Sequence, residues 1–71
     1  MNKYVCYEGE GHIWYYMNAK IVEELTNSIY SVKYEGLFYD GIYGMSYAKH
    51  NSVFDSEEKA EQFCNSKNNK E

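Results

Sequence analysis

The sequence predicts a single α+β domain in which an antiparallel sheet of three to four strands carries a C-terminal helix on one face. Two observations predict this class. An Asp-Gly dipeptide at 40–41 separates two segments rich in aromatic residues, which is typical of a β-hairpin. Residues 55–64 combine a helix-capping pattern with apolar residues at helical spacing. Because the chain has only 71 residues, we assign 1–64 to one compact domain and 65–71 to a polar tail that frays.

The first part of the chain is predicted to form one clear strand followed by an ambiguous segment. Residues 3–8 are β-branched and aromatic and end at a glycine, which is typical of a strand. In residues 13–27 the apolar side chains recur every four positions, as in a helix, although the first five of them have strong strand propensity. We favour a strand that ends at Met17 and a possible short helix over 19–26, with a single helix over the whole segment as the alternative.

The clearest predicted element is a β-hairpin whose two-residue loop is 40–41. Folding the chain about this loop pairs Tyr34 with Tyr47 and Gly36 with Met45. Large residues then face large residues across the two strands, and Met45 lies over the gap that the glycine leaves. The agreement between register and side-chain alternation supports this hairpin.

The last element is predicted to be a helix that begins at Asp55. Glu58 follows three residues later, which is the spacing of a capping box, and acidic residues suit the first turn of a helix. Ala60, Phe63 and Cys64 form one narrow apolar seam. A seam of this width covers only one face of the sheet.

The two cysteines, Cys6 and Cys64, lie near opposite ends of the chain. They form no CxxC pair and have no neighbouring histidine, so metal-ligand spacing is missing. We expect two buried thiols in a reducing compartment, with a disulfide between the first strand and the last helix as the alternative. No stretch is apolar enough to span a bilayer or to act as a signal peptide, so the expected location is the cytoplasm.

The residues that could carry catalysis are not arranged for it. The adjacent carboxylates at 23–24 and 57–58 point in different directions on a helix, and neither His12 nor His50 has a sequence neighbour that would orient it as a base. No glycine-rich phosphate loop follows a strand into a helix. We therefore expect a protein that is not an enzyme and that has no metal site and no cofactor.

Nine tyrosines are the most informative feature of the composition. A phenol buries a large ring but needs a partner for its hydroxyl, so a chain this short cannot hide all of them in a dry core. Exposed aromatic side chains rimmed by acids are typical of protein interfaces. An alternative is that Tyr simply replaces Leu in an AT-biased coding sequence. The residues predicted to contact a partner are Trp14, Tyr16, Tyr30, Tyr34, Glu35, Asp40, Tyr43 and Tyr47.

The charge balance limits the class of partner. With a net charge of −4 and no arginine, direct binding to nucleic acid is not expected. In size, acidity and aromatic content the chain is similar to small phage inhibitors of host proteins, anti-CRISPR proteins among them; this likeness is one of composition and carries no residue assignments. We therefore expect a protein-binding module that inhibits a host protein or ribonucleoprotein, for example by occupying its basic nucleic-acid groove. The alternatives are a module that binds single-stranded nucleic acid and a small homodimer whose exposed sheet is its own interface.

Overall fold

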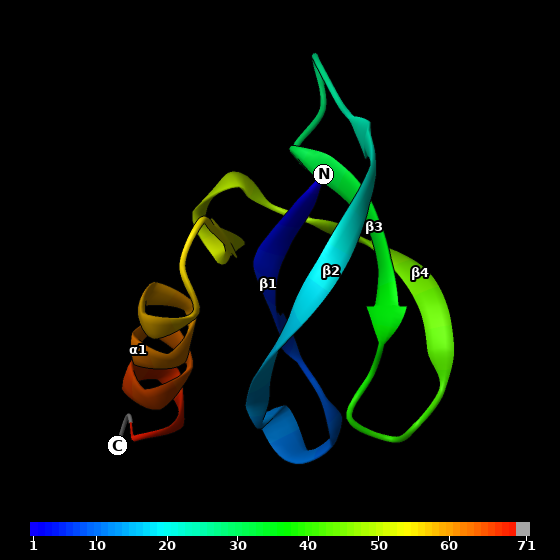
Figure 1. Cartoon of the computed structure of the whole chain (residues 1–71). Helices are drawn as coiled ribbons and strands as arrows, with labels where there is room; N and C mark the ends of the chain where they lie inside the picture. Colours follow the sequence, from blue (N-terminus) through cyan, green and yellow to red (C-terminus); the bar gives the residue numbers. More distant parts are fainter. Residues whose placement is uncertain (70–71) are drawn as a thin grey trace.

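The computed structural model describes residues 1–69 and arranges them as a five-stranded antiparallel sheet with a helix against one face (Figure 1). The strand order is β4-β3-β2-β1-β5, so β4 and β5 are the two edges of the sheet. The elements are β1 (Asn2–Glu8), β2 (Trp14–Glu24), β3 (Val32–Leu37), β4 (Tyr43–Ala48), β5 (Val53–Phe54) and α1 (Glu57–Asn68), with short 3-10 turns at Glu10–His12 and His50–Ser52. The predicted α+β class is confirmed, with one strand more than the upper expectation of four.

The segment that was expected to contain a helix is one long strand. β2 runs for 11 residues, so both the short helix over 19–26 and the single helix over 13–27 are wrong. Apolar residues four apart share a strand face as well as a helix face, because four is a multiple of the strand period of two. The β-branched Ile21 and Val22 suit the strand, which pairs with β1 along one side and with β3 along the other.

The predicted hairpin is present as β3 and β4, but its loop is one residue longer than expected. Residues 39–41 form the loop. The carbonyl of Phe38 accepts from the Gly41 N–H at 2.9 Å, and the N–H of Phe38 donates to the carbonyl of Ile42 at 2.9 Å. Gly41 has a φ of +86°, a left-handed conformation that glycine adopts without steric strain. This geometry is a turn followed by a left-handed residue, the usual form of a three-residue hairpin loop.

The extra loop residue shifts the register of the hairpin by one. Because side chains alternate along a strand, a shift of one residue moves every side chain of β4 to the other face. The predicted pairing of Tyr34 with Tyr47 is therefore wrong, and these two side chains lie on opposite faces of the sheet. Gly36 lies opposite Gly44, and the side chain of Met17 occupies the space beside it.

The larger of two cores lies on the concave face of the sheet. β1 and β4 contact each other although two strands separate them in the sheet order, so the sheet curls round this core (Figure 1). Tyr34, which is 1% exposed, is one of its largest members. The buried residues of this core are Val5, Met17, Ala19, Val32, Tyr34 and Ala48.

Three tyrosines join the β1–β2 loop to the β3–β4 loop at one end of the concave core. The rings of Tyr15 and Tyr39 stack with centroids 4.3 Å apart and an interplanar angle of 2°. The N–H of Tyr39 donates to the hydroxyl of Tyr7 at 2.8 Å, and the hydroxyl of Tyr39 accepts from the N–H of Glu10 at 3.1 Å. A Cβ atom on Gly9 would lie 2.7 Å from the Tyr39 ring and 2.8 Å from the Tyr15 ring, so only glycine allows this close approach.

The second core lies between α1 and the convex face over β1, β5 and the first half of β2. Its buried residues are Cys6, Ala60 and Cys64, so the apolar seam predicted for the helix does face the sheet. Partly buried aromatic side chains surround them. These are Tyr4, Trp14, Tyr16, Phe54 and Phe63.

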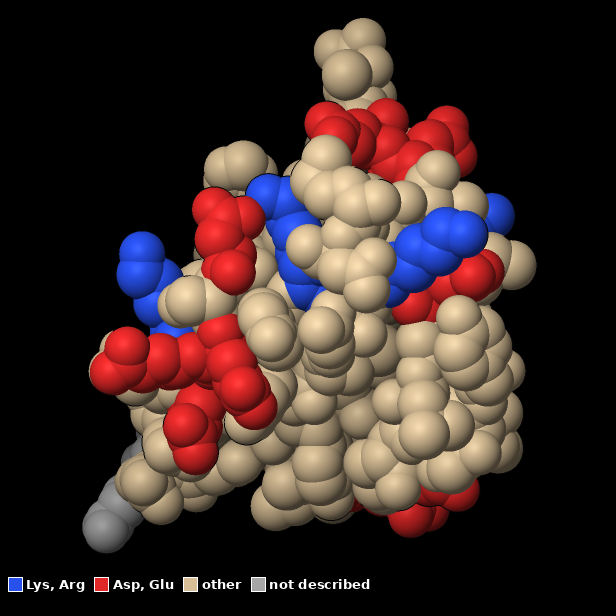
Figure 2. Space-filling model, in the orientation of Figure 1, with Lys and Arg blue, Asp and Glu red and all other residues tan. Residues whose placement is uncertain are grey.

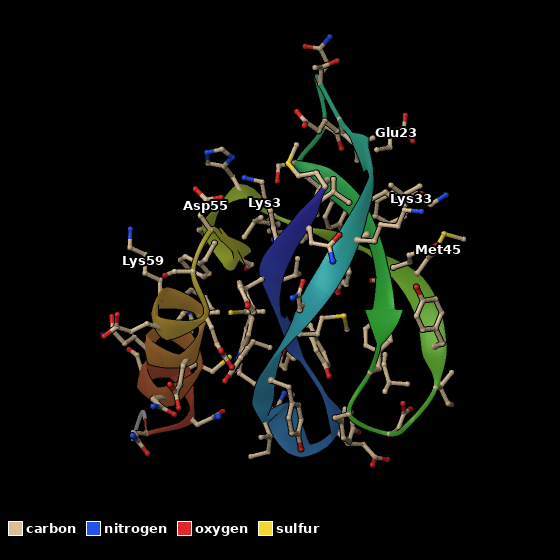
Figure 3. All side chains as sticks on the ribbon, in the orientation of Figure 1. Lys3, Glu23, Lys33, Met45, Asp55 and Lys59 are labelled. Atoms are coloured by element: carbon tan, nitrogen blue, oxygen red, sulfur yellow. The ribbon has the colours of Figure 1, made fainter. Side chains whose placement is uncertain are left out.

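The start of α1 differs from the expectation by one residue. Ser56 is the N-cap, and its hydroxyl accepts from the backbone N–H of Lys59 at 3.3 Å. Asp55, which was expected to cap the helix, instead forms an ion pair with Lys3 on β1, with 2.7 Å between carboxylate and ammonium (Figure 3). Because Ser and Asp are both strong N-cap residues, the sequence did not discriminate between neighbouring candidates.

The end of α1 also differs from the expectation. The helix continues through Asn68, so residues 65–68 belong to it rather than to a frayed tail. The side-chain oxygen of Asn68 accepts from the backbone N–H of Trp14 at 2.7 Å, and its amide nitrogen donates to the carbonyl of Trp14 at 3.0 Å. The Asn68 side chain therefore forms the two backbone hydrogen bonds to Trp14 that a neighbouring strand would otherwise form. The last residues of the predicted tail, 70–71, lie outside the described residues.

Candidate protein-binding surface

Part of the convex face is not covered by α1 and presents large apolar side chains to solvent. The helix lies over β1, β5 and the start of β2, which leaves β3 and β4 uncovered (Figure 1). Figure 2 shows a broad uncharged area on this side of the molecule, with basic and acidic groups at its upper margin and acidic groups below it. We call this area the β3–β4 face. Its exposed members are Leu37 (60%), Tyr43 (63%), Met45 (57%) and Tyr47 (50%).

The register of the hairpin places these side chains together. Leu37 lies opposite Tyr43, Met45 lies opposite Glu35, and Tyr47 lies opposite Lys33. Figure 3 shows the labelled Met45 and Lys33 at the end of the sheet away from α1. Because directly opposite residues on one face are neighbours, the four apolar side chains and the two charges form one continuous surface.

Two polar contacts hold the aromatic rings of this face in place. The hydroxyl of Tyr43 donates to a carboxylate oxygen of Glu35 at 3.2 Å, and the ammonium of Lys33 lies 5.9 Å from the ring centroid of Tyr47. Partial desolvation and the negative charge of Glu35 raise the pKa of the Tyr43 phenol. The phenol is therefore a neutral donor at physiological pH.

A shallow groove separates the β3–β4 face from the helix. Trp14 and Tyr16 line it from β2, Leu37 from β3, and Glu61 and Asn65 from α1. The groove continues the exposed apolar surface toward the helix core, because Leu37 belongs to both.

The aromatic walls of the groove are fixed by the helix. The hydroxyl of Tyr16 donates to a carboxylate oxygen of Glu57 at 3.0 Å. The Trp14 ring meets the ring of Phe63 edge-on, with 5.4 Å between the ring centroids. The ammonium of Lys67 lies 5.6 Å from the centroid of the Trp14 ring. These contacts hold both side chains half-buried, with one side toward the groove.

Most of the residues predicted to contact a partner lie on or beside this surface. Tyr43, Tyr47 and Glu35 lie on the β3–β4 face. Tyr30 packs against Tyr47 at 5.6 Å between ring centroids. The Asp40 carboxylate lies in the hairpin loop, where it accepts from the backbone N–H of Ile42 at 3.1 Å.

One predicted contact residue is in the wrong place. Tyr34 is buried in the concave core, so it cannot touch a partner. The error follows from the register, because a two-residue loop would have placed Tyr34 beside Tyr47.

The sequence reasoning missed two members of the surface, Leu37 and Met45. Leu37 alternates with Glu35, and this pattern already puts both on the polar face of β3. Met45 was expected to cover Gly36, a role that Met17 performs. A search for apolar residues on the otherwise polar face of the strand would have found Leu37.

The cysteine and histidine side chains lie off the β3–β4 face, although Cys64 lines the adjoining groove. Both cysteines are buried thiols, as predicted, and no disulfide joins them; burial and the neighbouring thiol raise the pKa of Cys6. The exposed His12 ring lies 2.8 Å from a carboxylate oxygen of Glu8, a pairing that the sequence analysis did not anticipate. Within residues 1–69 no three His, Cys, Asp or Glu side chains come together as metal ligands.

None of the helices in the described part of the chain is long and apolar enough to cross a membrane. Comparison with protein-family models, with curated proteins and with solved structures finds no match. The functional assignment therefore depends on the geometry of the β3–β4 face and its groove.

Proposed function

We propose that this chain is a small, non-catalytic protein-binding module that acts through the β3–β4 face and the adjoining groove. The observation that carries the proposal is the cluster of Leu37, Tyr43, Met45 and Tyr47, each at least half exposed, on a sheet face that no element of residues 1–69 covers. Exposed apolar clusters with aromatic members are typical of interaction sites.

The rings on this surface are suited to binding because they are already held in place. Tyr43 is fixed by Glu35, Tyr47 packs against Tyr30, and Tyr16 is fixed by Glu57. Side chains that are ordered before binding lose less conformational entropy in the complex. A partner would therefore gain most of the contact area of these rings at low entropic cost.

The acidic groups around the surface support a basic partner. Asp40 lies at the hairpin loop, and Glu57 and Glu61 lie across the groove on α1, in a chain with a net charge of −4. A protein surface with an apolar centre and a rim of Lys and Arg complements this arrangement. The nucleic-acid groove of a host protein or ribonucleoprotein is rich in Lys and Arg and would complement these acidic groups, which supports an inhibitory role of the kind that phage proteins perform. The free thiols support a reducing, cytoplasmic setting for this role.

The experiment is a pull-down from host lysate with three forms of the protein, followed by titration of each captured protein after purification. The test variant is the double substitution Tyr43→Ser with Tyr47→Ser, which removes two exposed rings. The control is Ile29→Ser, which removes an apolar side chain that is 73% exposed but lies outside the surface, in the β2–β3 loop. All three forms should unfold at similar urea concentrations, since none of these side chains is buried.

We expect a partner that the wild type and the control bind equally and that the double variant binds at least tenfold more weakly, as for central aromatic residues of an interface. If every captured protein binds the double variant as well as the wild type, or if none binds above background, the proposal is wrong. If single-stranded oligonucleotides bind the wild type at moderate salt and not the double variant, the surface is a stacking platform for nucleic acid instead.

A further inference from the structure

The outer edge of β4 is the most open strand edge in the described part of the molecule. β4 pairs only with β3, and the backbone groups of residues 43–47 form no other hydrogen bond within residues 1–69. Figure 1 shows β4 at the end of the sheet opposite to α1. Because Phe38 and Ile42 form a hydrogen-bonded pair, alternation leaves the N–H and C=O groups of Tyr43, Met45 and Tyr47 pointing away from β3.

Two of the other exposed strand edges within residues 1–69 are protected. β5, at the opposite edge of the sheet, is only two residues long and is followed by the charged Asp55. The outward backbone groups of Trp14 on β2 are bound by the side chain of Asn68. Edge strands are usually kept from pairing with other chains by short length, charge, proline or a bulge.

β4 has none of these protections. Its six residues, Tyr-Gly-Met-Ser-Tyr-Ala, include no charge and no proline, and its pairing with β3 shows no register shift. An unprotected strand of this length pairs readily with another strand. We propose that its partner is β4 of a second copy of this chain, in an antiparallel, two-fold symmetric pair.

The sequence of β4 is complementary to itself in this arrangement. With Met45 on the two-fold axis, Tyr43 of one copy lies opposite Tyr47 of the other, and the residues with outward backbone groups all face one another. About six backbone hydrogen bonds form between the copies in this register. Aromatic pairs across neighbouring strands are favourable, and no like charges oppose each other.

Charges just beyond the strand fit the same register. This register brings the loop that carries Asp40 toward Lys49 of the partner subunit. Because the pair is two-fold symmetric, opposite charges meet at both ends of the shared edge. The dimer joins two five-stranded sheets into a ten-stranded one. Because the edge pairs through its backbone, the β3–β4 faces of both copies lie side by side on the same surface. This inference does not depend on the proposed binding partner.

The test is the concentration dependence of the mass of the purified protein, measured by sedimentation between about 10 μM and 1 mM. The wild type is expected to rise from the monomer mass of 8.4 kDa toward twice that value. Met45→Lys places two ammonium groups opposite each other on the axis and should weaken self-association at least tenfold. Leu37→Lys, at a site of similar exposure on β3 and away from the edge, should leave it unchanged.

Amide exchange provides a second measurement that does not depend on a substitution. The N–H groups of Tyr43, Met45 and Tyr47 should become protected as the protein concentration rises, because they are free in the monomer. A monomer mass at all concentrations overturns the proposal. So does a dimer that survives Met45→Lys, and so does a loss of dimer with Leu37→Lys, which would show that faces rather than edges pair. None of these results involves a host partner, so they are distinct from failure of the proposed function.

Discussion

The contact between Asn68 and Trp14 leads to the sharpest stability prediction. The side-chain amide of Asn68 makes two hydrogen bonds to the backbone of Trp14, at 2.7 and 3.0 Å, and so joins the last turn of α1 to the start of β2. A typical neutral hydrogen bond contributes about 0.5–1.5 kcal/mol. Because the site is exposed and water can replace the amide, we expect Asn68→Ala to lower the free energy of unfolding by about 1–2 kcal/mol. That is a large share of the few kcal/mol available to a domain of this size.

Urea unfolding followed by Trp14 fluorescence measures this loss, and exchange of the Trp14 amide proton measures the local contact. Asn68→Asp keeps the acceptor but sets a second oxygen against the Trp14 carbonyl. The loss of unfolding free energy in Asn68→Asp relative to wild type should therefore be largest at neutral pH. It should shrink below about pH 4, where the carboxyl group is protonated and can donate a hydrogen bond. Asn69→Ala, a change of the same size at the next residue, is the control. The reasoning is refuted if Asn68→Ala and Asn69→Ala unfold alike and the Trp14 amide exchanges at the wild-type rate in both.

Three further outcomes follow from the two cores. Gly36→Ala should cost about 1–3 kcal/mol in urea unfolding, because the new methyl group meets the side chain of Met17. Cys6 and Cys64 should react with a thiol reagent only as fast as the protein opens, because both side chains are buried and burial also raises the pKa of each thiol. Burial also raises the pKa of the Tyr34 phenol, so its contribution to stability is complete below about pH 10 and is lost as the pH rises through the folded-state pKa. Unfolding free energies measured across this range should fall for the wild type and fall less steeply for Tyr34→Phe.

Each of these outcomes has its own contrary result. Gly44→Ala is the control for the glycine, since its Cβ would lie 3.8 Å from Phe38, an ordinary contact, and equal costs at the two glycines would contradict the packing argument. Rapid modification of either thiol in the native protein would show that the helix core opens easily. If the free energy of unfolding of Tyr34→Phe falls as steeply at alkaline pH as that of the wild type, other groups cause the fall.

The sequence was sufficient for the fold class, for β1, for the existence of the hairpin and for the seam of α1. It was not sufficient wherever two arrangements share a local pattern. Residues spaced by four suit a helix or a strand, and only pairing with β1 and β3 decides for a strand over 19–24. Asp40 and Gly41 suit loops of two or three residues, and the choice of three places Gly36 against Gly44.

The candidate surface shows how an error in the length of the hairpin loop affects the assignment of residues far from the loop. Tyr43 and Tyr47 are exposed, as expected for some of the tyrosines, because nine phenols exceed what the cores hold. Tyr34 was assigned with them only because the assumed register put it there. Tertiary contacts that join distant residues, such as Asn68 with Trp14, carry no local sequence signal, since the two lie 54 positions apart.

The position of the two cores along the chain has a consequence for synthesis on the ribosome. The concave core draws its buried residues from Val5 to Ala48, whereas the helix core also needs Ala60 and Cys64. Every residue of the concave core therefore leaves the ribosome before Ala60 and Cys64, and Cys6 stays uncovered until these two residues follow. In living cells, the interval between these two events is when that thiol is most open to oxidants.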